Sequence, residues 1–396
     1  MAIEAPVQPG STDDEAMILE VVRDLVRDRV APRAAEIDAR GEFARDIYDL
    51  FAQNDLLGIP FPAEYGGLGL SFGTYVKVVE EVSKACASSG LMIAVQELGA
   101  LPIIIAGNDA QKTKYLPKLA SGDYVAAYAL TEAGSGSDAA GSMRTRAEKR
   151  GDTYVLNGNK IWITQGSVAD VICVFAVTDP AKGPNGISAF IVEKTAPGFK
   201  VGKIEKKMGI RGSPTCELVF ENCEVPAENL LGPEGTGFKT AMKVLDKSRP
   251  GIAAQAVGIA QGALDYAAQY AQERIAFGKP IGQQQGIQFM LADMKVEVEA
   301  SRLLLYEAAR KCDADSPELT LFAALAKLKA GDTAMKVTTD AVQILGGFGY
   351  STEYPVERMM RDAKITQIYE GTQQIQRLVI ARTLVGKWKP PANGKA

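Results

Sequence analysis

The chain contains no histidine among its 396 residues, so the side chain that most often acts as a general base near neutral pH is missing. Ser-His hydrolases, Cys-His proteases and histidine-ligated zinc or haem are therefore excluded. A carboxylate becomes the natural base, provided that burial raises its pKa. Among the carboxylates, Glu370 stands between Tyr369 and Gly371 just ahead of a helical stretch. Taken alone, Glu370 is best interpreted as an ordinary residue before a helix.

The other reactive residue types point away from metal, disulfide and nucleotide-loop chemistry. Five cysteines are widely scattered, with no CxxC pair, which predicts free thiols in a reducing, cytoplasmic compartment and no metal site. The loop GSGSD at 134–138 lacks the third glycine of GxGxxG, and no GxxxxGK[ST] occurs. Nicotinamide Rossmann and P-loop sites are therefore excluded. The loop is either a plain turn or a place where backbone N–H groups approach a phosphate or a flavin.

The composition is that of an ordinary globular chain. The chain has a mass of 42.2 kDa, and 46% of its residues are hydrophobic and 23% are charged. Its length predicts two or three domains. The net charge of −4 gives no electrostatic basis for binding nucleic acid or an anionic membrane. Residues 1–17 lack the segments of a secretion signal or a transit peptide, and no stretch approaches a membrane span. We therefore expect no nucleic-acid partner and no membrane span.

The elements that must position a site follow from the hydrophobic periodicity. Apolar residues recur every three or four positions in the N-terminal part, which predicts helices over 13–37, 44–54, 71–87, 100–106 and 110–119. The pattern then becomes strand-like, with a hairpin predicted around Asn157-Gly158 within 153–164 and strands over 171–178, 186–193 and 216–225. Helical periodicity returns over 238–248, 252–274, 287–312, 318–345 and 373–384. This order predicts an α+β protein with helical, antiparallel β and helical domains at 1–123, 124–237 and 238–396.

Six motifs in order along the chain carry a resemblance to a known family. They are TEAGSGSD at 131–138, KIWIT at 160–164, DKSRP at 246–250, ERIAFGKPIGQQQ at 273–285, DAVQILGGFGY at 340–350 and MRDAKITQIYEGTQQIQR at 360–377. Together they resemble the acyl-CoA dehydrogenases, especially the short- and medium-chain branch, with the short-chain members most similar. The resemblance implies the fold of that family, in which the C-terminal domain is a four-helix bundle.

The resemblance also implies a reaction. Family members oxidise an acyl-CoA thioester to the trans-2-enoyl-CoA, with FAD accepting the β-hydride at N5, and pass electrons to an electron-transferring flavoprotein. Glu370 matches the catalytic base, and its backbone N–H would hold the thioester carbonyl. Some relatives carry the base near position 248 instead, but Ser248 cannot act as one.

The resemblance implies a set of binding residues. The FAD site is shared between chains in this family, which implies a homotetramer built as a dimer of dimers. Positions matching FAD-binding residues are Tyr128, Leu130, Thr131, Ser137, Trp162, Thr164, Arg274, Phe277, Gln285, Gln343, Gly346, Gly347, Thr372 and Gln374. Positions matching substrate-binding residues are Ser137, Asp246, Arg249, Gln255, Thr366, Tyr369 and Gly371.

The acyl group is indicated by a few pocket positions. Gln255 and Thr366 are similar to the short-chain pair, which implies an acyl chain of about four carbons. Glu97 lies in the segment 90–100 that corresponds to the pocket bottom. It is either a solvated helix carboxylate or a pocket residue. In the pocket it would favour a branched, cyclic or polar acyl group. The arginine that glutaryl-CoA dehydrogenases use is replaced by Gly90 or a neighbour, which disfavours a dicarboxylyl substrate.

Two other functions remain open. One is a flavoenzyme of the same fold that lets oxygen in, an acyl-CoA oxidase or a monooxygenase, although such oxidases usually carry a further C-terminal domain. The other is a catalytically silent subunit that binds acyl-CoA or flavin, and the presence of Glu370 argues against it.

Overall fold

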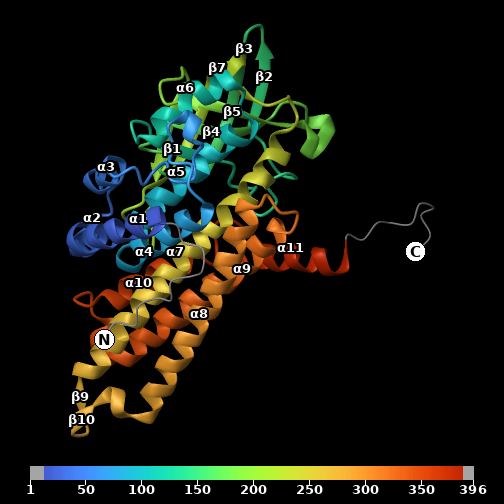
Figure 1. The fold of residues 1–396 in the computed structure, drawn as a ribbon. Helices are drawn as coiled ribbons and strands as arrows, with labels where there is room; N and C mark the ends of the chain where they lie inside the picture. Colours follow the sequence, from blue (N-terminus) through green and yellow to red (C-terminus); the bar gives the residue numbers. More distant parts are fainter. Residues whose placement is uncertain (1–12, 387–396) are drawn as a thin grey trace, which may run out of the picture.

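The computed structural model describes residues 13–386, so the predictions for the first residues and for the polar tail at 389–396 lie outside the described residues. A helical N-terminal part, a sheet and a C-terminal helical part follow one another along the chain, as expected (Figure 1). The N-terminal helices are α1 (Asp13–Leu25), α2 (Ala34–Arg40), α3 (Arg45–Gln53), α4 (Phe72–Ala85), α5 (Ala87–Ala106) and α6 (Asp109–Ala120).

The first predicted helix, over 13–37, is wrong in its continuity. A π-helical turn (Val26–Val30) and a 3₁₀ turn (Ala31–Arg33) separate α1 from α2. Pro32 lies in the 3₁₀ turn and has no backbone N–H to donate, so one hydrogen bond of a regular α-helix is lost at this point.

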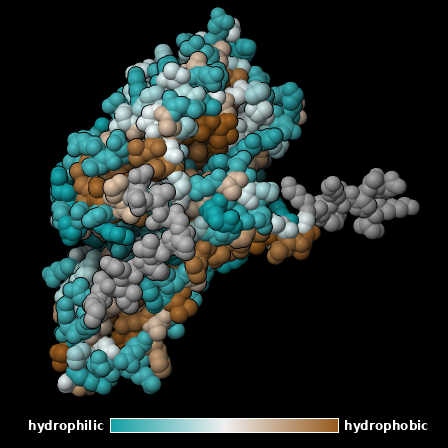
Figure 2. Space-filling model, in the orientation of Figure 1, coloured by the Kyte–Doolittle hydropathy of each residue, from teal (hydrophilic) through white to brown (hydrophobic). Residues whose placement is uncertain are grey.

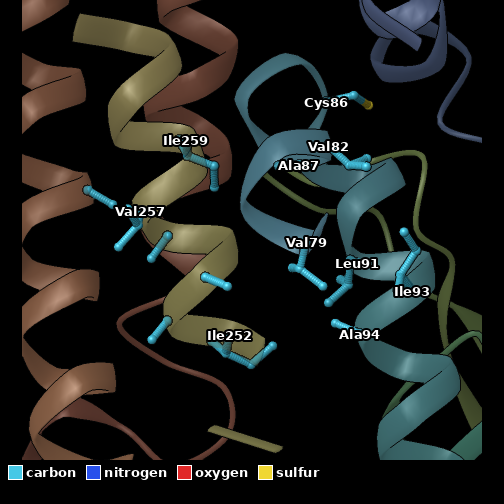
Figure 3. Close-up of a cluster of buried hydrophobic side chains, with 14 of the residues drawn as sticks. Val79, Val82, Cys86, Ala87, Leu91, Ile93, Ala94, Ile252, Val257 and Ile259 are labelled. Atoms are coloured by element: carbon cyan, nitrogen blue, oxygen red, sulfur yellow. The ribbon is translucent and has the colours of Figure 1, made fainter. Parts of the chain in front are cut away.

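α5 is a single 20-residue helix, where sequence periodicity predicts a helix only over 100–106. By length and composition it is apolar enough to cross a membrane, contrary to the expectation that no stretch approaches a span. Within the molecule, however, 83% of its apolar window is buried. Figure 3 shows Leu91 and Ala94 of this helix lying close to Val79 of α4, with Ile252 of a long C-terminal helix opposite. α5 is thus a buried core helix of the described chain.

The sheet has eight strands in the order β6-β7-β3-β2-β4-β5-β8, with β1 added beside β4. Most pairs are antiparallel, as predicted, but β1 runs parallel to β4 and Arg146 of β2 pairs in parallel with Val177. The strands are β1 (Ala126–Ala129), β2 (Arg146–Arg150), β3 (Thr153–Thr164), β4 (Val171–Val177), β5 (Ile187–Glu193), β6 (Phe199–Ile204), β7 (Thr215–Pro226) and β8 (Leu230–Leu231).

The hairpin predicted at Asn157-Gly158 is wrong. β3 runs through this dipeptide as one strand, because its long partner β7 pairs with both halves. The register shifts between Leu156 and Gly158, so the glycine marks a bulge instead of a turn. A Cβ at Gly158 would lie 2.6 Å from Thr145 Oγ1, and its φ of 145° suits glycine.

The C-terminal helices form the bundle. They are α7 (Gly237–Glu273), α8 (Gln285–Asp313), α9 (Leu319–Leu345), α10 (Pro355–Ile365) and α11 (Gln373–Val385), and a two-stranded ribbon of β9 (Ile275–Ala276) and β10 (Lys279–Pro280) joins α7 to α8. The prediction of two helices, 238–248 and 252–274, is wrong because α7 continues through Pro250. The lost backbone hydrogen bond is tolerated because residues 248–260 are all buried in the surrounding core.

Candidate active site

Glu370 lies on the short loop that joins α10 to α11. Its φ is 55° and that of Gly371 is 88°, so two successive residues take the left-handed conformation. This backbone is held from both sides. Gln376 donates through Nε2 to the carbonyls of Glu370 (3.1 Å) and Gly371 (2.9 Å), and Lys327 of α9 donates through Nζ to the Gly371 carbonyl at 2.7 Å. A non-glycine residue persists at such a φ only where its surroundings determine it.

The carboxylate of Glu370 meets α7. Ser248 Oγ donates to Glu370 Oε2 at 2.9 Å, and Arg249 Nε donates to the Glu370 carbonyl at 3.4 Å. Burial raises the pKa of Glu370, while the Ser248 hydroxyl and the positive charges of Arg249 and Lys327 oppose the rise. The carboxylate thus has a raised pKa and keeps the hydrogen bond from Ser248 and the nearby positive charges. A general base near neutral pH requires this combination.

A mostly apolar pocket opens beside this carboxylate. Thr164 at the end of β3 and Tyr369 contribute polar groups, and the remaining walls come from α5 and α7. The lining residues are Leu91, Ala94, Val95, Leu98, Thr164, Ser248, Ile252, Tyr369 and Glu370. An apolar pocket with one carboxylate in its wall can hold a short hydrocarbon chain and take a proton from it.

Lys327 is a buried cation behind the Glu370 loop. Besides the Gly371 carbonyl, its ammonium contacts Gln373 Oε1 at 3.3 Å. The pKa of Lys327 is lowered to about 7, mainly by burial and also by the charge of Arg249, while Glu370 and Asp332 act in the opposite direction. The loop that carries the base is therefore fixed by a cation that itself titrates near neutrality.

The first group of predicted cofactor residues surrounds the same pocket. Trp162 is 55% exposed at φ 60°, two residues before Thr164 in the pocket wall. The Tyr128 hydroxyl is buried without a hydrogen-bond partner in the described chain, and burial and then the charge of Glu370 raise its pKa well above normal. The exposed indole of Trp162 offers a face on which a flat ring can stack.

The loop after β1 is anchored beneath its glycines. Lys160 is fully buried and pairs with Glu132 at 2.7 Å, and the Glu132 carboxylate accepts from the backbone N–H groups of Arg144 and Thr145. The glycines above it, Gly134 and Gly136, have open space where a Cβ would stand. The buried ion pair holds the loop in place, and the open space at both glycines leaves their backbone accessible to a phosphate or a flavin.

A second group of predicted cofactor residues gathers at the other end of α7. The Arg274 guanidinium lies over the Phe348 ring at 5.4 Å, and Phe277 is 94% exposed at φ 53°. Ser248 and Glu273 stand 25 positions apart on one helix, about 38 Å at 1.5 Å per residue. The residues of this distal group are Arg274, Phe277, Gln285, Gln343, Gly346 and Gly347. One chain therefore cannot bring both groups to a single flavin.

Family models for acyl-CoA dehydrogenases match nearly the whole chain: the N-terminal domain over residues 12–123, the middle domain over 127–223 and the C-terminal domain over 235–385. The chain belongs to the acyl-CoA dehydrogenase family. The members of this family are oxidoreductases, so the predicted family, fold and enzyme class are confirmed.

Individual relatives of this acyl-CoA dehydrogenase family member cover it almost entirely. Cyclohex-1-ene-1-carbonyl-CoA dehydrogenase of Syntrophus aciditrophicus is 52% identical over 94% of this chain and 90% of its own. The structure of butyryl-CoA dehydrogenase from Megasphaera elsdenii matches with a TM-score of 0.93 and 47% identity, over 96% and 100% of the two chains. A chain from a study of the electron transferring flavoprotein of Acidaminococcus fermentans matches with a TM-score of 0.94 and 48% identity, over the same shares.

The predicted substrate residues of this family member divide into two sets. Tyr369 lines the pocket, and Gly371 follows the base. Gln255 is fully buried behind the wall, where it accepts from the Tyr369 hydroxyl and donates to the Ala87 carbonyl at 2.9 Å. Thr366, also buried, bonds the Ala363 carbonyl at 2.7 Å. Neither Gln255 nor Thr366 is among the residues that line the pocket, so both would act through Tyr369 and the backbone.

The remaining predicted contacts differ in exposure. Arg249 is buried, with its guanidinium bonded to Asp246 at 2.7 Å and to the Glu370 carbonyl, so it supports the base loop from inside. Ser137 and Gln374 are exposed, and the Leu130 and Thr131 carbonyls accept from Lys160 and from the Ile161 N–H. Thr372 caps α11 by accepting from the Ile375 N–H.

Two residues that contact Glu370 or the loop that carries it were missed in the sequence analysis. Ser248 is considered there only as a possible base, whereas its hydroxyl donates a hydrogen bond to Glu370. Lys327 stands outside every motif, although a lysine among the alanines at 323, 326, 330 and 334 lies on an apolar helix face and needs a buried partner. That pattern was the available signal.

Proposed function

We propose that this protein is an FAD-dependent dehydrogenase that converts a short-chain acyl-CoA into the trans-2-enoyl-CoA. The observation that carries the proposal is the position of Glu370: a buried carboxylate with a raised pKa in the wall of an apolar pocket, bonded by Ser248 at 2.9 Å. In a chain without histidine, Glu370 takes the α-proton of the thioester. Its backbone N–H holds the thioester carbonyl as negative charge develops.

The residues around the pocket fit FAD. The exposed Trp162, the unpartnered Tyr128 hydroxyl and the open glycines of the anchored loop offer a stacking face, a hydrogen bond and backbone access. Trp162 and Thr164 would hold the isoalloxazine, together with Tyr128, Leu130, Thr131, Ser137, Thr372 and Gln374. When bound, FAD supplies the acceptor for the β-hydride.

The acyl group is short or cyclic. The pocket walls Leu91, Ala94 and Ile252 are apolar, and relatives of nearly 50% identity act on butyryl-CoA and on a cyclohexenyl thioester. We place a chain of about four carbons first, because an extra methylene in a closed pocket costs about 1–3 kcal/mol of discrimination. A cyclic or branched acyl group is the second candidate.

The assembly is proposed to be a homotetramer, a dimer of dimers in which the distal group around Arg274 holds the pyrophosphate and adenine half of a neighbour's FAD. Two exposed apolar surfaces support it. On α8, Phe289, Val296 and Leu303 are exposed at a spacing of seven residues. At the projecting end of α11, Leu384 and Val385 are exposed, where Figure 2 shows apolar surface. Such surfaces favour contact with further copies of the chain.

The remaining assignments are also proposals. An electron-transferring flavoprotein is the proposed electron acceptor, in line with the study from which one structural relative comes. The five buried, unpaired cysteines suit a reducing, cytoplasmic compartment. We keep the division into domains at 1–123, 124–237 and 238–396.

An anaerobic visible spectrum of the purified protein, recorded before and after addition of butyryl-CoA, tests the function. We expect an oxidised flavin band that bleaches. A band that persists with butyryl-CoA but bleaches with cyclohexanecarbonyl-CoA would select the cyclic acyl group. Rapid reoxidation by oxygen would favour an oxidase. A flavin band that no acyl-CoA bleaches would favour a silent binding subunit, and the absence of flavin after FAD is added back would contradict the proposal.

A further inference from the structure

Two buried polar side chains next to the pocket of Glu370 have unused hydrogen-bonding groups. Glu97 of α5 is 1% exposed, and neither of its carboxyl oxygens has a partner in the described chain. The hydroxyl of Tyr75, on α4, is buried and equally unpartnered. Buried polar groups in folded proteins are nearly always satisfied, so a pair of this kind needs an explanation.

The hydroxyl of Tyr75 contacts α7 at Gly251, where the helix has no side chain. A Cβ at Gly251 would lie 2.7 Å from Tyr75 Oη, so the missing side chain of Gly251 admits the hydroxyl. Ser248 and Ile252, on either side of Gly251 in sequence, both line the pocket. The phenol therefore ends at the stretch of α7 that forms one wall.

Glu97 lies on α5, the helix that forms the opposite wall, and like Tyr75 it is next to pocket-lining residues without being one of them. Ala94 is one turn earlier on α5 and Leu98 is the next residue, and both line the pocket. The Glu97 carboxyl influences the pKa of Tyr75 of α4 and that of Cys312 of α8, and it interacts with the charge of Glu370. Glu97, Tyr75 and Glu370 are therefore close enough to interact around one pocket.

The electrostatics decide which form Glu97 takes. Burial raises the pKa of Glu97 well above its ordinary value, the charge of Glu370 raises it further, and Lys247 of α7 opposes the rise. The pKa of Tyr75 is also raised, by burial and then by the charges of Glu97 and Glu370. The raised pKa values favour the protonated, uncharged form of both groups, and in that form each can donate one hydrogen bond.

We propose that Glu97 and Tyr75 form a binding site for an uncharged oxygen, a hydroxyl or carbonyl, carried by the acyl chain. The inference rests on the proposed function. Two O–H donors beside an apolar pocket match an acceptor oxygen, whereas a methyl group leaves both unsatisfied. A distal carboxylate is disfavoured because it would lie near the negative charge of Glu370, and Lys247, the cation on this side, already pairs with Asp315.

The test compares acyl-CoAs that differ in one atom. Pentanoyl-CoA and 4-hydroxybutyryl-CoA have the same number of non-hydrogen atoms, as do hexanoyl-CoA and 5-hydroxypentanoyl-CoA. The kcat/KM ratio of hydroxy over methyl substrate is measured for the wild-type holoenzyme and for Glu97→Met, Glu97→Gln and Tyr75→Phe. Ser83→Ala is the matched control, since Ser83 is also a buried hydroxyl of α4 without a partner in the described chain, but it faces Gly90 and Gly258.

In at least one pair we expect the ratio to fall tenfold or more in Glu97→Met and Tyr75→Phe, with Glu97→Gln intermediate because its amide still donates. Ser83→Ala keeps the wild-type ratio. If all variants share one ratio while butyryl-CoA still reduces their flavin, waters satisfy the pair and the inference is wrong, although the proposed function stands. If no acyl-CoA reduces the wild-type flavin, the proposed function fails. Should Glu97→Met not fold, the near-isosteric Tyr75→Phe and Glu97→Gln decide the question.

Discussion

Two buried glutamates lie at the pocket, one in its wall and one beside it, and their surroundings differ. Glu370 receives a hydrogen bond from Ser248 and lies near the positive charges of Arg249 and Lys327. Glu97, on α5, is also buried but has neither a hydrogen bond nor a paired cation within the described chain. Desolvation raises both pKa values, and the partners of Glu370 oppose the rise there. The surroundings of Glu370 therefore favour ionisation more than those of Glu97 do.

Removing the base gives the largest expected effect. Glu370→Gln preserves the shape of the site but cannot accept a proton, so we expect kcat to fall by about 10²–10⁴-fold. Bound flavin and the melting temperature should stay close to wild type. Steady-state turnover with butyryl-CoA measures the loss. Glu353→Gln, which alters an exposed carboxyl before α10, is the control. Full turnover by Glu370→Gln would show that the base lies elsewhere.

Stability distinguishes a partnered from an unpartnered buried glutamate. Glu97→Met removes an unsatisfied carboxyl, and we expect the free energy of unfolding to rise by about 1–3 kcal/mol. Glu80 is buried too but binds Arg302 at 2.8 Å, so Glu80→Met should lower the free energy of unfolding by about 1–3 kcal/mol, because Arg302 loses one carboxylate partner and keeps only Glu299 at 2.6 Å. Denaturant unfolding of the holoenzyme measures both. A loss of stability in Glu97→Met would mean that the carboxyl has a partner in solution.

A substitution of Lys327 changes the pKa of Glu370 without altering the carboxylate itself. In Lys327→Met the positive charge that favours ionised Glu370 is lost, so the pKa of Glu370 rises and the rising limb of kcat against pH moves to higher pH. Because the pKa of Lys327 is about 7, the difference from wild type should be largest below that pH. We expect kcat to fall about tenfold at about pH 6.5, since one lost interaction of about 1.4 kcal/mol has that effect. Lys329→Met, a partly exposed position on the same helix, should leave the profile in place.

Ser248→Ala gives the smallest of these effects. The hydroxyl stabilises the ionised form of Glu370. Its removal therefore raises the pKa of Glu370 and shifts the pH profile upward by about one unit, the value of a hydrogen bond to a charged group. Ser248→Thr retains the hydroxyl and should restore the wild-type profile. A downward shift would contradict the assignment of the hydroxyl as donor.

Local signals in the sequence were sufficient for much of the fold. The change from helical to strand periodicity near residue 124 and back near 238 agrees with the observed order of elements. They were insufficient where distant contacts override a local preference. Asn157-Gly158 favours a turn, yet pairing with β7 carries β3 through it, and Pro250 lies inside α7 because the core surrounds it.

The candidate site divides in the same way. Glu370 could be proposed because its neighbours in sequence form a motif and because no histidine competes for the role. Lys327 and Tyr75 have no such motif, and their relevance depends on which loop or helix each one meets. The two interpretations of Glu97, solvated or in the pocket, could be separated only by its burial, and the structure excludes the solvated one.

Glu370, the proposed base, and Trp162, a proposed flavin-stacking residue, both have a positive φ, at 55° and 60°. Each such conformation costs a non-glycine residue about 1–2 kcal/mol. Glycine at either position would relieve that strain while removing the carboxylate or the indole. A screen that scores only expression or thermal stability would therefore retain a glycine allele of Glu370 that lacks the proposed base.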